Sequence, residues 1–167
     1  RLPWLLILLF ASMLSGTVIG TFSQSLSEVV ALAFFIPTLT GTGGNAGTQS
    51  LAIVVRGIAT GDLDRDKMFH HLLREVRVGA VTALMCGLVI SLIAFFWQGT
   101  YFIGLVVGLA MFFTIITATL VGTTTPFIID YLGADPAVAA GPFITTLIDV
   151  SGLFIYFSLA KFLLQYL

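Results

Sequence analysis

Asp149 is the residue with the clearest potential for chemistry, because it lies inside an apolar run, TTLIDVSGLFIYF, that is long enough to cross a bilayer. A charged side chain at the centre of a membrane costs about 2.5–3.5 kcal/mol on insertion scales. No Lys, Arg or His lies at a comparable depth in any apolar run of the sequence. Asp149 is therefore expected to be either protonated or neutralised by a cation.

A second polar segment, PTLTGTGGNAGTQS at residues 37–50, interrupts another apolar run. Pro37 removes a backbone donor and clashes with the preceding turn, and glycines weaken a helix, so this segment is predicted to break its helix. Gly141 and Pro142 are predicted to break the last run in the same way. Backbone carbonyls freed inside a membrane are tolerated only against protein or a water-filled cavity.

A water-filled passage lined by oxygen atoms accounts for both the helix breakers and the polar side chains of this segment. The alternative, close helix packing through Gly43 and Gly47, accounts for the glycines alone. The residues predicted to line the passage are Pro37, Gly41, Gly43, Gly44, Asn45, Thr48, Gln49, Thr145 and Thr146.

The available donor atoms are carboxylate, hydroxyl, amide and carbonyl oxygens, and no Cys, His or Met clusters with them. Such a set suits Mg²⁺, Ca²⁺, Mn²⁺ or an alkali ion better than Zn²⁺ or Cu⁺. One carboxylate per chain supplies only one negative charge for a divalent ion. A homodimer whose two-fold axis runs along the pore would supply two.

The elements that must position these residues are apolar helices. The 167 residues are 58% hydrophobic and only 9% charged, which is typical of a polytopic membrane protein. We predict an all-α fold with a single membrane domain over residues 1–167. Its five transmembrane helices are predicted at residues 2–22, 26–55, 76–97, 101–129 and 137–164.

The distribution of basic residues predicts the orientation of the chain. Five Lys and Arg residues follow the second span, whereas the connections after the first and third spans have none. Positive charge stays on the cytoplasmic side, which predicts a cytoplasmic N terminus in the cell membrane. The net charge of −1 gives no indication of a nucleic-acid partner.

Three further patterns have structural explanations. Small residues recur every fourth position and predict close helix packing. The acidic stretch after the second span lacks the glycine and final glutamate of a calcium loop, so Asp66 is expected to cap a short helix from about residue 67. His70 and His71 are adjacent and would point in different directions on a helix, which disfavours a metal pair. The small-residue series are Ser12, Gly16 and Gly20; Gly79, Ala83, Gly87 and Ser91; and Gly104 and Gly108.

The segment PTLTGTGGNAGTQS and the final LGADPAVAAGPFITTLIDVSGLFIYF together resemble the MgtE magnesium channel family. The resemblance implies a homodimeric, Mg²⁺-selective channel in the plasma membrane, with the second and fifth spans of both subunits lining the pore. Asp149 matches the central pore carboxylate, which holds a largely hydrated Mg²⁺. Asp135 matches an acidic residue at the cytoplasmic mouth that is implicated in closure. Full-length relatives also carry cytoplasmic regulatory modules, acidic helical and CBS, which this sequence does not include.

Two other classes of protein remain as alternatives. A cation-coupled secondary transporter would use Asp149 as an ion or proton carrier, and it too uses interrupted helices at mid-membrane. An intramembrane aspartyl protease needs two carboxylates that share a site, and only Asp149 is predicted to lie deep in the membrane. We therefore do not expect an enzyme.

Overall fold

The computed structural model describes residues 2–23, 29–63, 68–133 and 135–165, and every regular element in this part of the chain is helical. This confirms the all-α prediction. The expected cap at Asp66 lies outside the described residues. The elements are α1 (Leu2–Thr21), the 3₁₀ helix η1 (Val30–Phe35), α3 (Ile36–Ala59), α4 (Met68–Gln98), α5 (Tyr101–Tyr131) and α6 (Pro136–Leu164).

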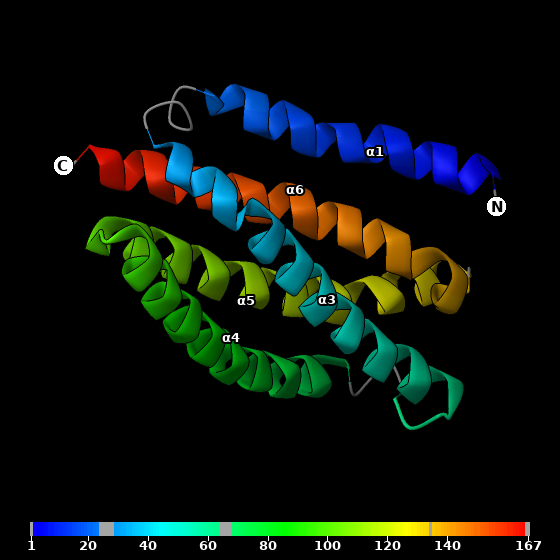
Figure 1. The fold of residues 1–167 in the computed structure, drawn as a ribbon. Coiled ribbons are helices and arrows are strands. Elements are labelled where there is room, and N and C mark those ends of the chain that lie inside the picture. Colours follow the sequence, from blue (N-terminus) through cyan, green and yellow to red (C-terminus); the bar gives the residue numbers. More distant parts are fainter. Residues whose placement is uncertain (1, 24–28, 64–67, 134, 166–167) are drawn as a thin grey trace.

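The helices run up and down alternately (Figure 1). The end of α3 and the turn from α5 to α6 lie toward the same end of the bundle as the start of α1, and the C terminus lies at the opposite end (Figure 1). Positive-φ glycines follow three of the helices, at Gly61, Gly99 and Gly133. A glycine in this conformation ends a helix without steric cost, so α4 and α5 are joined by a very short turn.

Helix α5 forms the centre of the bundle. It contacts α4, α3 and α6, whereas α1 lies along α6 at the edge of the bundle (Figure 1). Most side chains of α5 are buried, among them Val106, Ala110 and Ile115. The outer faces of α1 and α4 instead expose large apolar side chains such as Phe10 and Phe96. An apolar exterior around a buried helix is typical of a protein that is surrounded by lipid.

Three helices, α4, α5 and residues 141–163 of α6, are long and apolar enough to cross a membrane. Helix α1 offers a shorter apolar stretch, Leu5–Thr21. Helix α3 has 24 residues, a sufficient length, but its polar segment lowers its mean hydropathy. Length and composition therefore support three of the five predicted spans directly.

The prediction that Pro37 and the glycines break their helix is wrong. Helix α3 is continuous from Ile36 to Ala59, and Pro37 occupies its first turn. A proline is tolerated at this position because the first N–H groups of a helix have no intrahelical partner. Helix α6 likewise continues through Pro142. The second span also begins later than predicted, after η1, whereas α4 begins eight residues earlier than the third span was predicted to begin.

The predicted close packing of small residues is confirmed between α4 and α5. A Cβ added at Gly87 would lie 2.9 Å from the carbonyl oxygen of Gly108, and one at Gly104 would lie 2.8 Å from that of Ser91. The two backbones therefore touch, as small-residue series allow. On α1 the same prediction is not met within this chain, because a Cβ added at Gly16 or Gly20 would meet nothing within 4 Å.

A buried hydrogen bond fixes η1 against α6. The hydroxyl of Tyr156 donates to the carbonyl oxygen of Leu32 at 2.9 Å, and both residues are fully buried. Tyr156→Phe removes the donor and leaves a buried carbonyl unpaired, which costs about 1–3 kcal/mol. We expect the free energy of unfolding, measured by denaturant titration in detergent, to fall by this amount. The exposed Tyr101 provides the matched control, and equal stabilities of Tyr156→Phe and Tyr101→Phe would show that the bond contributes nothing.

Candidate ion-binding site

Asp149 lies about midway along α6 and is half-buried. The preceding residue, Ile148, is fully buried against α3 and α5, so the two side chains leave the helix in different directions. No hydrogen bond or ion pair to Asp149 occurs within the described part of the chain. Its carboxylate therefore has no internal partner among these residues, although unpaired charges are rare away from water.

The contacts between α3 and α6 show which residues lie level with Asp149. Gly44 lies opposite Thr145, Gly43 opposite Ile148, and Gly141 opposite Leu51. Residue numbers thus rise on one helix as they fall on the other, so the two helices are antiparallel. One turn beyond the contact of Gly44 with Thr145, this register brings Gly41 of α3 level with Asp149 of α6.

A polar stripe follows the exposed side of α3. Gly41, Asn45 and Gln49 are exposed and four residues apart, which places them on one face. No hydrogen bond to either amide side chain occurs within the described residues. Exposed amides without partners are costly in lipid, so this face must meet water, an ion or another protein surface. We call Gly41, Asn45, Gln49 and Asp149 the polar face.

The glycines of α3 divide into two groups. A Cβ added at Gly43 would lie 2.7 Å from Cγ2 of Thr114, and one at Gly47 would overlap Ile148, so both glycines are packing contacts with α5 and α6. A Cβ at Gly44 would make an ordinary 3.8 Å contact with Thr145, and one at Gly41 would meet nothing. Gly41 is therefore open on the polar face and Gly44 adjoins this face, whereas Gly43 is enclosed between helices.

The hydroxyl groups near this face donate their hydrogens to their own helices. Thr48 donates to the carbonyls of Gly44 and Asn45, and Thr145 and Thr146 both donate to that of Pro142. Each hydroxyl oxygen keeps lone pairs as its remaining hydrogen-bonding capacity. The water molecules around a cation point their hydrogens outward, so such acceptors suit a hydrated ion.

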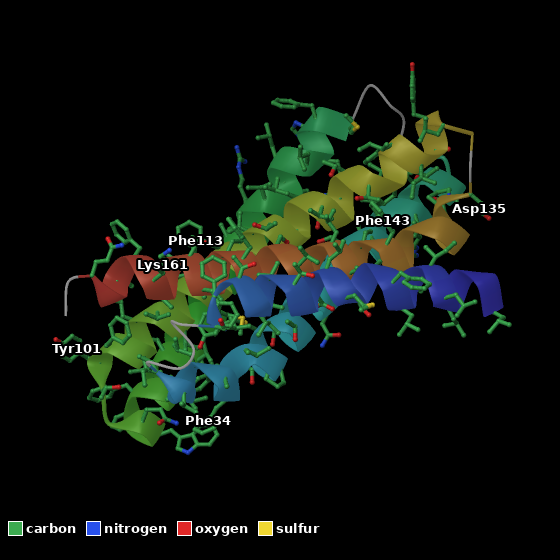
Figure 2. The ribbon with its side chains drawn as sticks, turned by 90° about the horizontal axis from the view of Figure 1, so that it is seen from above. Phe34, Tyr101, Phe113, Asp135, Phe143 and Lys161 are labelled. Carbon is green, nitrogen blue, oxygen red and sulfur yellow. The ribbon has the colours of Figure 1, made fainter. Side chains whose placement is uncertain are left out.

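Asp135 lies far from Asp149 along α6. It is exposed and directly precedes Pro136, the first residue of that helix. Figure 2 shows Asp135 at one end of the bundle and Tyr101 and Lys161 toward the other. The two predicted metal ligands therefore do not share a site. No group of three or more His, Cys, Asp or Glu gathers at one place among residues 2–23, 29–63, 68–133 and 135–165.

Sequence reasoning overlooked two polar residues of the bundle. Thr114 of α5 is buried behind the candidate site, between Gly43 and Gly152. Glu75 of α4 is largely buried and lines a cavity near the end of α3. A hydroxyl within an apolar helix gave a weak signal for Thr114. The charge of Glu75 was visible in the sequence, but residues 68–75 were predicted to lie outside the third span.

Comparison with known families identifies the family of the chain. The MgtE family, described as divalent cation transporters, matches residues 36–159, a range that begins at α3 and ends within α6. The chain belongs to the MgtE family. The family predicted from the two polar segments is therefore confirmed.

Three curated MgtE proteins are similar to nearly the whole chain, and each is named a magnesium transporter. The relative from Enterococcus faecalis is 46% identical over 99% of this chain, and that from Bacillus subtilis is 43% identical over 96%. The relative from Thermus thermophilus is 39% identical over 99%. The aligned region is 36–37% of each relative, so the chain spans just over a third of their length.

Proposed function

We propose that this chain is the pore-forming membrane domain of a Mg²⁺-selective channel, in which Asp149 of two subunits holds the ion at mid-membrane. The observation that carries the proposal is the unpaired, half-buried carboxylate of Asp149 beside the polar face of α3. Both features lie in a bundle whose outer surface is otherwise largely apolar. Relatives named magnesium transporters favour Mg²⁺ among the cations that an oxygen site accepts.

Charge balance supports a homodimer. A Mg²⁺ ion facing one Asp149 would keep a net charge of +1 in a region of low dielectric, whereas two symmetry-related carboxylates neutralise it. The polar face supports the same arrangement, since a second copy would cover its unpartnered amides. In a two-fold dimer the same patch meets itself, so the pore would lie on the axis between two polar faces.

The ion is proposed to keep most of its water. Mg²⁺ loses water reluctantly and usually binds through one or two carboxylates together with several water molecules. The hydroxyls of Thr48, Thr145 and Thr146 donate their hydrogens to backbone carbonyls, so their oxygens would accept hydrogen bonds from this water. Asn45 and Gln49 would extend the acceptor lining along α3, with Pro37 and Gly41 nearer its start.

The topology follows from the alternating helices. Counting α1 and α3 as spans gives five crossings and places the two termini on opposite sides (Figure 1). Arg56, Arg74 and Arg77 flank the connection from α3 to α4, so that end and the N terminus are proposed to be cytoplasmic in the plasma membrane. Asp135 is at this end too, because α5 returns to it. The additional length of the relatives is consistent with cytoplasmic regulatory domains in the full-length protein.

Flux measurements distinguish a channel from a coupled transporter. In proteoliposomes that contain the full-length protein, a channel is expected to pass Mg²⁺ down its electrochemical gradient at a rate that follows the membrane potential. A proton or sodium gradient should add nothing beyond its effect on that potential. Accumulation of Mg²⁺ against its own gradient, driven by protons or sodium at zero potential, would favour the secondary transporter instead.

Asp135 is proposed to be a water-exposed Mg²⁺ site at the cytoplasmic mouth. A carboxylate near the N terminus of α6 is also favoured by the helix dipole, so binding and capping must be separated. We expect Asp135→Asn to shift the cytoplasmic Mg²⁺ concentration that reduces flux, while Mg²⁺ affinity at Asp149 stays the same. An unchanged Mg²⁺ response together with reduced stability would leave Asp135 only its capping role.

A further inference from the structure

A small cavity lies between α3, α4 and α5, and a larger share of its lining is polar than in the other described cavities; Asp149 does not line it. Its volume is about 90 Å³, and the other described cavities are mainly apolar. Its walls come from the second half of α3, the first half of α4 and the second half of α5. The polar residues that line it are Gln49, Ser50, Glu75, Thr82 and Thr119.

Glu75 contributes a carboxylate to this cavity, and its side chain is only 12% exposed. Among the described residues, Glu75 pairs with His71, one turn earlier on α4, whose Nε2 lies 4.0 Å from Oε1 of Glu75. This distance exceeds that of a hydrogen bond. The Nε2 atom is itself buried and has no hydrogen-bond partner among the described residues. Among the described residues, the largely buried carboxylate of Glu75 therefore has no hydrogen-bond partner.

The other polar side chains that line the cavity carry oxygen atoms, and the rest of the lining is apolar. The hydroxyls of Thr82 and Thr119 donate to the carbonyls of Val78 and Ile115, so they have acceptor capacity left. Ser50 is buried, and its hydroxyl makes no hydrogen bond within the described residues. The space corresponds to about three water molecules at about 30 Å³ each. A carboxylate surrounded by oxygen acceptors and a little water is the environment that a hard cation requires.

We propose that this cavity is a second divalent-cation site, with the Glu75 carboxylate as its charged ligand. Ser50, Gln49 and Thr119 would hold the ion directly or through water. Glu75 is largely buried, and its 4.0 Å spacing to His71 is longer than a hydrogen bond, so a bound cation would give the carboxylate a direct partner.

The proposed second site adjoins the polar face of α3. Gln49 lines the cavity and also belongs to the polar face of α3. An ion in the cavity would tie α3 to α4 through Glu75 and to α5 through Thr119. The inference concerns binding and stands on the cavity itself, so it does not depend on Asp149 holding an ion.

The test is a Mn²⁺ titration of the full-length protein in nanodiscs, stripped of metal and followed by electron paramagnetic resonance. All variants carry Asp149→Asn, so any ion at Asp149 is removed from the comparison. We expect Glu75→Gln to remove one Mn²⁺ site per subunit or to weaken it at least about tenfold. The stabilisation of the protein by Mn²⁺ in a thermal scan should fall with it. Asp62→Asn, which alters an exposed carboxylate in the connection from α3 to α4, should change neither.

Ser50→Ala keeps the test decisive if Glu75→Gln fails to fold, because it removes only a hydroxyl and should also weaken the site. An unchanged number and affinity of Mn²⁺ sites in the folded variants would overturn the inference.

Discussion

Replacing Asp149 with asparagine is expected to abolish Mg²⁺ flux while the helix bundle stays folded. The change keeps the size of the side chain and removes the charge that offsets the cation. A carboxylate about 4–5 Å from a divalent ion contributes several kcal/mol at an effective dielectric constant of about 20. In a homodimer both copies are lost, so Mg²⁺ affinity should fall at least about 100-fold. Flux into proteoliposomes and isothermal titration in nanodiscs measure the two effects.

Folding should survive because Asp149 makes no hydrogen bond or ion pair within the described residues. The charge-matched control is Asp149→Glu, which keeps the carboxylate and should retain part of the flux. Selective Mg²⁺ flux at the normal rate in Asp149→Asn would contradict the role proposed for this residue. A variant that loses flux only because it no longer elutes as a folded assembly would mean that Asp149 is structural.

Gly122→Val is expected to have the largest effect on stability. A Cβ at Gly122 would overlap the backbone of Gly47, so α5 and α3 are in direct backbone contact there. A backbone cannot move aside as a flexible side chain can. Overpacking usually costs about 1–3 kcal/mol, and we expect the upper end of this range or more. Thermal unfolding in detergent should show a lower midpoint or no folded protein.

Gly41→Val provides the matched control for Gly122→Val. A Cβ at Gly41 meets no atom within 4 Å, so the added side chain should leave stability nearly unchanged. Because Gly41 lies on the polar face, the same change should nevertheless reduce Mg²⁺ flux. If Gly122→Val and Gly41→Val unfolded at the same temperature, the close approach of α3 and α5 would not be important for stability.

The sequence correctly predicted that Asp149 lies within a long apolar helix, because a carboxylate in an apolar run is a strong and local signal, whereas its role as an ion ligand stays a prediction. The start of α5 at Tyr101 was also predicted correctly, since Gly99 marks the preceding turn. The helix breaks that were predicted at Pro37 and Pro142 do not occur. Local propensity disfavours glycine and proline in helices, but Gly43 and Gly47 are buried where neighbouring helices approach closely, and tertiary packing supplies most of the stability of a helix.

The cavity at Glu75 depends on contacts between residues far apart in the sequence. Ser50, Glu75 and Thr119 belong to three different helices, and no spacing rule within one helix relates them. The hydrogen bond from Tyr156 to Leu32 joins residues that are 124 positions apart. Features of this kind become visible only once the helices are assembled, whereas charge, hydropathy and motif spacing can be read beforehand.

The position of a bound ion tests the central claim most directly. Crystals of the full-length protein with Mn²⁺ would locate the ion by its anomalous scattering. We expect a peak on a two-fold axis between the Asp149 residues of two subunits, about 4–5 Å from their carboxylate oxygens if one shell of water intervenes. A peak enclosed within a single protomer and remote from Asp149, with that axis unoccupied, would contradict it.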